Sequence, residues 1–186
     1  MATADLEGYL AFFRAVEPLK DTLRSGYTAQ GRPESTAEHT WRACLMAVTL
    51  AEELPGVDAG RLVAMLVVHD IAEAVGGDVP APQQTGDKSA AERADLAELI
   101  APLPPAAAAR IAKLWEEYAA AATPEALLAK GLYRLEIVLQ HTQGTNPPDF
   151  DYAFNLRYGR EHTERHPLVA ALRAAVDAET ARRAGH

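Results

Sequence analysis

The residues best suited to chemistry lie together in an otherwise apolar segment, residues 61–75. His69, Asp70 and Glu73 follow Leu66 by three, four and seven positions, so a continuous helix would place them all on one face. Burying such polar and charged groups without partners is costly. They therefore need one another, a metal ion or a water-filled pocket. The clustering favours a metal site over a core histidine paired with a neighbouring carboxylate.

The donor atoms indicate which metals this site would take. His69 offers an imidazole nitrogen and Asp70 a carboxylate oxygen, a mixed set that suits Mn, Co, Fe, Ni or Zn better than Ca or Mg. A further ligand must come from another element, and His39 is the best candidate. Spacing alone leaves a second interpretation of His39 open, a capping or surface histidine near the start of a helix.

Helical spacing of apolar residues dominates the chain, and long alternating strand patterns are absent. The expected helices cover about residues 5–17, 36–52, 61–75, 90–100, 105–121, 124–141 and 167–183. Glu34-Ser35-Thr36 supplies cap residues for the second helix, whose apolar face would carry Trp41, Cys44, Leu45 and Val48. The third is apolar nearly all round, which indicates a central helix. The sequence predicts an all-α fold in a single domain, residues 1–186.

Composition and charge exclude several function classes. No apolar run reaches the roughly 18 residues that span a bilayer, and we expect no membrane partner. The net charge of −8 argues against general nucleic-acid binding but permits a small phosphorylated substrate. The N-terminal residues show no secretory signal, and the single cysteine, Cys44, fits a reducing compartment. We therefore expect a cytoplasmic protein.

Two strings resemble the HD-domain superfamily. They are Arg-Pro-Glu-Ser-Thr-Ala-Glu-His39-Thr-Trp-Arg and His69-Asp-Ile-Ala-Glu-Ala-Val-Gly-Gly-Asp78-Val-Pro-Ala-Pro. The ordered set is most similar to the branch of 5′-deoxynucleotidases, which remove phosphate from deoxynucleoside 5′-monophosphates. The resemblance covers about residues 5–140, and a C-terminal loop and helix follow at 142–186. It implies a helical bundle of the HD type, and members of this branch form homodimers.

The resemblance also implies a role for each site residue. It implies one divalent metal held by three ligands, His39, His69 and Asp70. Glu73 would position or deprotonate the attacking water, and Asp78 would assist the leaving oxygen or hold the sugar. Arg24 falls where the family places an arginine that grips the phosphate, although without the resemblance it would read as a solvated surface charge.

One position departs from the family pattern. The family closes its metal site with an aspartate in a Lys-x-x-Asp-x-x-Glu context, whereas this chain has Lys130-Gly-Leu-Tyr133-Arg-Leu-Glu136. A phenol with an ordinary pKa of about 10 is a poor ligand for most of these metals at neutral pH, although a tyrosinate can ligate Fe(III). Three outcomes stay open: a three-ligand site with extra waters, a site that Glu136 reaches, or a site that is empty or occupied differently. Glu136 has an alternative role in a surface or outer-shell pair.

Three functions compete at this stage. The leading one is a metal-dependent phosphohydrolase acting on a small phosphomonoester, with nucleoside 5′-monophosphates as the first class. The second is a metal-deficient HD protein that binds a nucleotide or another ligand without catalysis, which Tyr133 favours. The third is oxidative chemistry at iron, which usually needs more histidine and carboxylate ligands than can be assigned here.

The C-terminal part carries less information. Residues 142–155 are expected to form a loop, either as part of a pocket wall or as a packed loop anchored by Phe150 and Phe154. The remaining internal histidines are expected at the surface or in loops; they are His141, His162 and His166.

Overall fold

Helices account for most of the secondary structure, as the apolar spacing predicts. The structure is a computed structural model and describes residues 3–79 and 88–185. The longer helices are α1 (Thr3–Ala15), α2 (Thr36–Thr49), α3 (Ala59–Val68), α5 (Lys88–Ile100), α6 (Pro105–Ala120), α7 (Pro124–Gln143) and α10 (Pro167–Arg183). The short ones are α4 (Glu73–Gly76), α8 (Tyr152–Asn155) and α9 (Arg160–Thr163), with 3-10 turns at Glu17–Lys20 and Ala51–Glu53. The predicted all-α class is confirmed.

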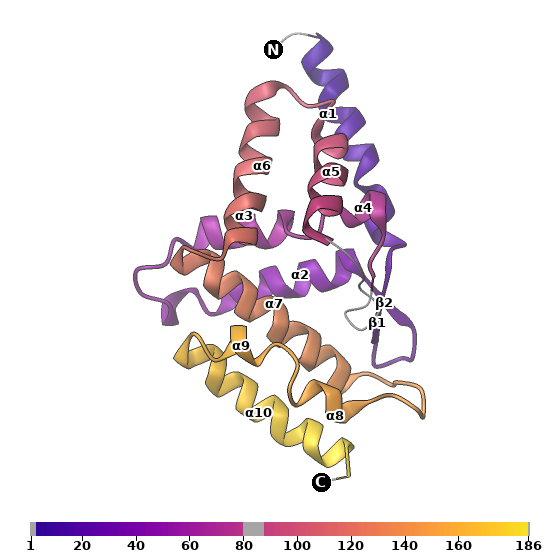
Figure 1. Ribbon diagram of the computed structural model, residues 1–186, viewed down its shortest axis with the longest axis vertical. Coiled ribbons are helices and arrows are strands. Elements are labelled where there is room, and N and C mark those ends of the chain that lie inside the picture. The colour runs from indigo at the N-terminus through magenta and orange to yellow at the C-terminus, as the bar shows by residue number, and fades with distance from the viewer. Residues whose placement is uncertain (1–2, 80–87, 186) are drawn as a thin grey trace.

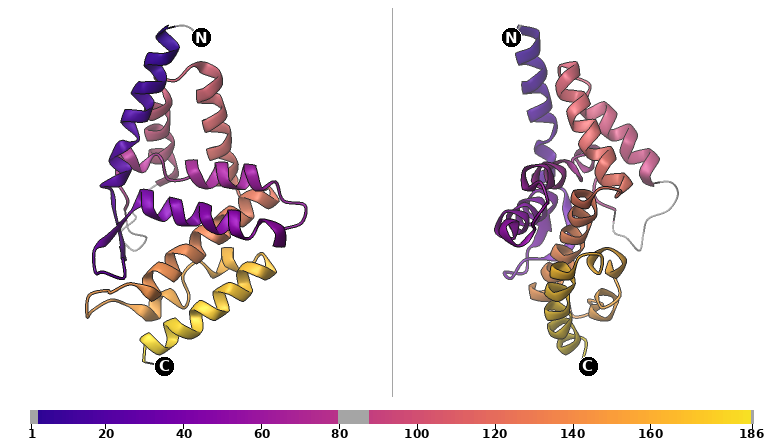
Figure 2. Two further views of the ribbon diagram at one scale, coloured as in Figure 1. Left: turned by 180° about the vertical axis from the view of Figure 1, so that it is seen from behind. Right: turned by 90° about the vertical axis from the view of Figure 1, so that its left-hand side faces the viewer.

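Helix α7 is the centre of the arrangement. It contacts α2, α3 and α6, and also α9 and α10. Figures 1 and 2 show α1, α5 and α6 together at one end of the molecule and α10 at the other. One apolar cluster joins α2, α3, α7 and α10, and a second joins α5 and α6 to α1. In the described part of the chain, no helix is long and apolar enough to cross a membrane.

A small hairpin precedes α2. Strands β1 (Leu23–Tyr27) and β2 (Pro33–Ser35) pair antiparallel in a two-stranded sheet. The sequence pattern gave no signal for it, because the strands are too short to show alternation. Ser35 then caps α2: its hydroxyl accepts from the backbone N–H of Glu38, whose carboxylate accepts from the N–H of Ser35. The hairpin therefore fixes Arg24 of β1 beside the first turn of α2.

The predicted helix over 61–75 is wrong in its second half. Helix α3 ends at Val68, and α4 begins at Glu73. The ring Nδ1 of His69 donates a hydrogen bond to the backbone carbonyl of Leu66 at 2.6 Å. The indole of Trp115 donates a second hydrogen bond to the backbone carbonyl of His69 at 3.2 Å. Both carbonyls would otherwise accept the next helical N–H groups. The chain therefore turns at His69 instead of presenting one continuous helical face.

The apolar face that the sequence indicates for α2 is mostly exposed, and only Cys44 of its four residues packs against the core. Trp41, Leu45 and Val48 are 66%, 43% and 59% exposed. The buried stripe instead runs through His39, Ala43 and Ala47 at four-residue spacing, together with Thr36. The small side chains of Ala43 and Ala47 let α2 pack closely on its neighbours. Close packing therefore decides which face of α2 is buried, although the opposite face carries larger apolar residues.

Other boundaries lie within a few residues of those expected. The region 142–155 is a loop that ends in α8. The end of the second motif string, Pro80-Ala-Pro82, lies outside the described residues.

Candidate metal centre

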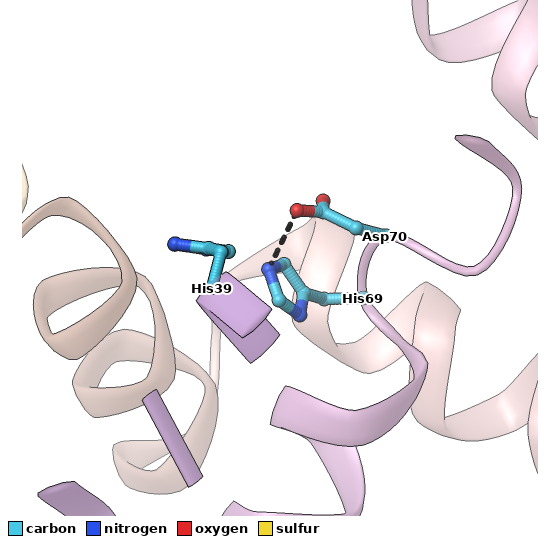
Figure 3. Close-up of side chains that lie close together, drawn as sticks. All are labelled: His39, His69 and Asp70. Carbon is cyan, nitrogen blue, oxygen red and sulfur yellow. Dashed lines mark ion pairs between the residues drawn. The ribbon is translucent and has the colours of Figure 1, made fainter. Parts of the chain in front are cut away.

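Three side chains from two separate segments meet at one point. His39 comes from α2, and His69 and Asp70 come from the turn after α3. One ligand atom of each lies within 4.8 Å of the other two. Figure 3 shows His39 beside the His69 ring and the Asp70 carboxylate above it, with the His69 Nε2 turned toward that carboxylate. The broken helix thus brings together the residues that a continuous helix was expected to align.

The hydrogen bond of His69 fixes its tautomer. A carbonyl can only accept, so the Nδ1 that faces the Leu66 carbonyl carries the proton. In the neutral ring, Nε2 then offers a lone pair, and it lies 2.9 Å from a carboxylate oxygen of Asp70 without forming a hydrogen bond. Two acceptor atoms held this close repel each other unless a cation or a proton lies between them.

His39 is oriented in the same manner. Its Nδ1 is hydrogen-bonded to Glu136 on α7, and both side chains are fully buried. Glu136 also accepts from the Nε of Arg42 at 2.7 Å. Burial opposes ionisation of Glu136, but His39 and Arg42 outweigh it and hold the pKa of this carboxyl below its usual value. The other ring nitrogen, Nε2, is buried and has no hydrogen-bond partner.

Burial and the nearby Arg24 lower the pKa of His39, although Glu136 opposes them. The ring is therefore neutral at ordinary pH, which is the form that binds metals. A carboxylate hydrogen-bonded to the far nitrogen of a ligand histidine is the usual outer-shell arrangement in metal sites. Of the two roles considered for Glu136, the geometry matches the outer-shell pair.

Arg24 lies at the centre of the acidic residues. Its Nη1 is 3.4 Å from Asp70, 3.7 Å from Glu73 and 3.8 Å from Asp78, measured to one carboxylate oxygen of each. The side chain is only 8% exposed. The surface interpretation of Arg24 is therefore wrong, and the hairpin places this cation beside Asp70.

Glu73 differs from the other carboxylates in its environment. It is 5% exposed and accepts a hydrogen bond from the Thr36 hydroxyl at 2.9 Å. Burial and the neighbouring Asp70 charge raise the pKa of Glu73 to about 9, despite the opposing effect of Arg24. Its carboxylate form is consequently a stronger base than an exposed glutamate.

Tyr133 stands against both histidines. Its ring is edge-on to His39 and His69, with centroids 5.0 and 4.9 Å apart. Burial and the Asp70 charge raise the pKa of the phenol above its ordinary value, so the hydroxyl stays protonated at neutral pH. Tyr133 therefore closes one side of the cluster as an aromatic wall and not as an anion.

A cavity of about 330 Å³ opens onto this cluster. Its wall includes site residues, aromatic residues and further cations; among them are Arg24, His69, Asp70, Asp78, Trp115, Tyr118, Lys130, Tyr133, Arg134, His141 and Tyr158. The surface prediction for His141 is wrong, because its ring is buried and bonded to Asn155 at 2.9 Å. His162 and His166 are half-buried. Of the loop anchors, Phe154 lines the cavity, so part of 142–155 does contribute to its wall.

The donor set fits a divalent transition metal. Two imidazole Nε2 atoms are buried without hydrogen-bond partners, and a carboxylate oxygen lies beside them. Buried polar atoms are normally satisfied, so two acceptors without hydrogen-bond partners at one point fit an electrophile such as a divalent cation. A second group with suitable spacing, Glu34, His39 and Glu136, uses the same histidine. Its His39 nitrogen is already engaged with Glu136, which leaves the first group as the better fit.

Comparisons with known proteins agree with this geometry. The HD domain family model matches residues 16–173. The chain is 30% identical over 185 residues to the 5′-deoxynucleotidase HDDC2 of Danio rerio, covering 95% of this chain and 90% of that protein. The Dictyostelium discoideum protein of the same name is 29% identical, with 94% and 99% covered. Among solved structures, a predicted metal-dependent phosphohydrolase from Magnetospirillum magnetotacticum superimposes with a TM-score of 0.81 at 33% identity, covering 97% and 94% of the two chains.

Proposed function

Since the chain belongs to the HD-domain family, we propose that it is a divalent-metal-dependent phosphohydrolase whose substrate is a nucleoside 5′-monophosphate. The observation that carries the proposal is the pair of unpartnered Nε2 atoms of His39 and His69 beside Asp70. The likeness to 5′-deoxynucleotidases over most of the chain supports the substrate class. We also propose that residues 1–186 act as one domain.

The proposed ligands of the metal are His39, His69 and Asp70, and the proposed metals are Mn, Co, Fe, Ni or Zn. A cation held there would supply a Lewis acid for the phosphoryl oxygens and lower the pKa of a water molecule. Arg24 would donate hydrogen bonds to the phosphoryl oxygens, because its guanidinium lies among the ligand carboxylates and lines the cavity.

Proton transfer would fall to the carboxylates around Arg24. Glu73 would orient the attacking water and, in its carboxylate form, accept its proton, since it lies 3.7 Å from Arg24 and beside Asp70. Thr36 would hold the Glu73 carboxylate in place through the hydrogen bond described above. Asp78 lines the cavity and lies 3.8 Å from Arg24, where it would assist the leaving oxygen or hold the sugar.

The test is phosphate release from a nucleotide panel with each of the proposed metals. We expect about one metal ion per chain, release that depends on the metal, and a loss of at least about a hundredfold in Asp70→Asn. Asp149→Asn is the matched control, because Asp149 is exposed in the loop before α8. Metal-independent release, or equal activity of the two variants, would overturn the proposal.

A second candidate, a nucleotide binder without catalysis, is favoured by one observation. The position where the family has an aspartate carries a protonated phenol, so the cluster contains one carboxylate ligand fewer. Elemental analysis separates the candidates, because a binder would contain less than about a tenth of a metal ion per chain. In that case nucleotide binding would persist without added metal, and no phosphate would be released.

We propose, finally, that the protein is a cytoplasmic homodimer. Support for a dimer comes from the apolar residues that α2 exposes, Trp41, Leu45 and Val48. Support for the location comes from the free thiol of Cys44. Light scattering of Trp41→Glu would test the dimer: the expected result is a monomer with unchanged helix content, and an unchanged mass would exclude this face.

A further inference from the structure

The cavity contains cations that the proposed mechanism does not use. Lys130 and Arg134 are one turn apart on α7, and both line the cavity beside the metal-ligating cluster. Burial lowers the pKa of Lys130, and the positive charge of Arg134 lowers it further. Glu92, which also lines the cavity, and Asp70 oppose both effects. Two like charges on one helix face are mutually destabilising, and a bound anion would stabilise them further.

Arg134 is held in place without a counter-ion. It donates a hydrogen bond to the Tyr158 hydroxyl, and its guanidinium lies 4.8 Å from the ring centre of Tyr133 and 4.9 Å from that of Tyr158. Among the described residues, no carboxylate lies within 4.0 Å of it. A guanidinium has five N–H donors, and the Tyr158 hydroxyl engages Nη1 of a side chain that lines the cavity.

The backbone is built around this arginine. Gly159 has φ +71°, and a Cβ there would lie 2.8 Å from Cβ and 3.0 Å from Cγ of Arg134. The stem of Arg134 therefore passes through space that only a glycine leaves open. Because residues of the turn before α9 hold this side chain of α7 in one conformation, less conformational entropy is lost when the guanidinium binds an anion.

Lys130 is fixed by an aromatic ring as well. Its ammonium lies 4.5 Å from the ring centre of Tyr118, and Glu92 on the cavity wall acts on it electrostatically. Tyr118 in turn packs on His69, with centroids 5.1 Å apart. The two cations thus surround the metal-ligating cluster on its α7 side, separated from it by aromatic rings.

Arg24 presents the opposite situation. It faces Asp70, Glu73 and Asp78, whereas Arg134 forms an ion pair with none of them. One cation is therefore integrated with the metal ligands, and two others stand nearby with spare donors.

We propose that Arg134, Lys130 and the Tyr158 hydroxyl form a subsite for a second phosphate, so that the preferred ligand carries two phosphate groups. One would lie at the metal centre, which rests on the function proposed above, and the other against Arg134. A guanidinium binds phosphate through paired N–H donors, and Lys130 adds a point charge. Nucleoside 3′,5′-bisphosphates and nucleoside 5′-diphosphates are the ligand classes with this chemistry. The cavity volume of about 330 Å³ is in the range of small-molecule sites.

The test compares three ligands that differ in the second phosphate. Deoxyadenosine 5′-monophosphate, its 3′,5′-bisphosphate and its 5′-diphosphate are titrated calorimetrically without added metal, and KM is measured with Mn wherever phosphate is released. The expected result is at least about tenfold tighter binding of one two-phosphate ligand than of the monophosphate, the size of one charge-assisted contact. Which of the two gains affinity tells whether the second phosphate is on the sugar or on the first phosphate.

Arg134→Gln should abolish this preference and leave monophosphate binding within about twofold, because one charge-assisted contact would be lost. Tyr158→Phe, which keeps the ring, should reduce it in part. Arg110→Gln, at an exposed arginine of α6, controls for net charge and should change nothing. Equal binding of all three ligands by the native chain overturns the proposal, and so does an equal loss for every ligand in Arg134→Gln. If the preference is present but no ligand releases phosphate, the proposed function fails and the subsite stands.

Discussion

The imidazole of His39 and the carboxylate of Glu136 form a hydrogen-bonded pair in which both side chains are fully buried. The two residues are 97 positions apart in the sequence. The pair engages Nδ1 of His39 and leaves Nε2 buried without a hydrogen-bond partner, in a residue that is grouped with His69 and Asp70, which is the state that a metal ligand needs.

Glu136→Gln should weaken metal binding by about 10- to 100-fold, because an amide neither fixes the His39 tautomer as firmly nor raises the basicity of its ring. Titration with Co or Mn, followed by calorimetry, measures the effect. Glu164→Gln, at an exposed carboxylate that pairs with Arg160, is the control and should bind as the native chain does. Unchanged affinity in Glu136→Gln would show that the pair does not serve the metal.

Tyr133→Asp should strengthen metal binding by about tenfold or more, because it adds a carboxylate where a neutral phenol now faces both histidines. Tyr133→Phe should leave metal affinity unchanged, since it removes a hydroxyl that stays protonated and keeps the aromatic wall. The same calorimetric titration serves for both variants. A loss of affinity in Tyr133→Phe would instead make the tyrosine oxygen a ligand.

Gly159→Ala should destabilise the fold more than Gly56→Ala does. Both glycines have positive φ, +71° and +83°, so both substitutions cost about 1–2 kcal/mol of backbone strain. Only at Gly159 does the added Cβ also meet Arg134, which adds about 1–3 kcal/mol of overpacking. Urea unfolding measures both. Equal losses would mean that the Arg134 stem moves aside freely.

Cys44 should react slowly with alkylating reagents. Burial raises the pKa of its thiol from an ordinary 9.0 to about 11, and the thiolate is the reactive form. At pH 8 the folded protein should therefore be alkylated about a hundredfold more slowly than the urea-unfolded chain, and the rate should rise with pH until about 11. Mass spectrometry with iodoacetamide follows the reaction. A rate that levels off near pH 9 would contradict the shift.

The sequence was sufficient to predict the helical class and which residues meet at the centre, because apolar spacing and the motif order depend on local information. It could not place the end of α3. That end depends on Trp115, whose indole donates a hydrogen bond to the His69 carbonyl although the two residues are 46 positions apart in the sequence. The exposed face of α2 was missed for the same reason, since close packing through Ala43 and Ala47 is a tertiary property.

The additional cations were missed for a related reason. Lys130 and Arg134 are ordinary helix residues at four-residue spacing, and nothing local marks them as cavity-facing. What fixes Arg134 in the cavity wall is its hydrogen bond to the Tyr158 hydroxyl and the space beside Gly159. Both residues belong to the turn that follows α8. His141 was assigned to the surface because its partner, Asn155, also comes from that region.

The bend at His69 has a thermodynamic consequence. Because the centre draws its groups from α2, from the turn after α3 and, through Glu136, from α7, a cation bound there would connect segments that separate when the chain unfolds. The unfolded chain has no such cluster, so the affinity of the cation and the stability of the fold are linked quantities. Each tenfold excess of free metal over its dissociation constant would raise the unfolding free energy by about 1.4 kcal/mol.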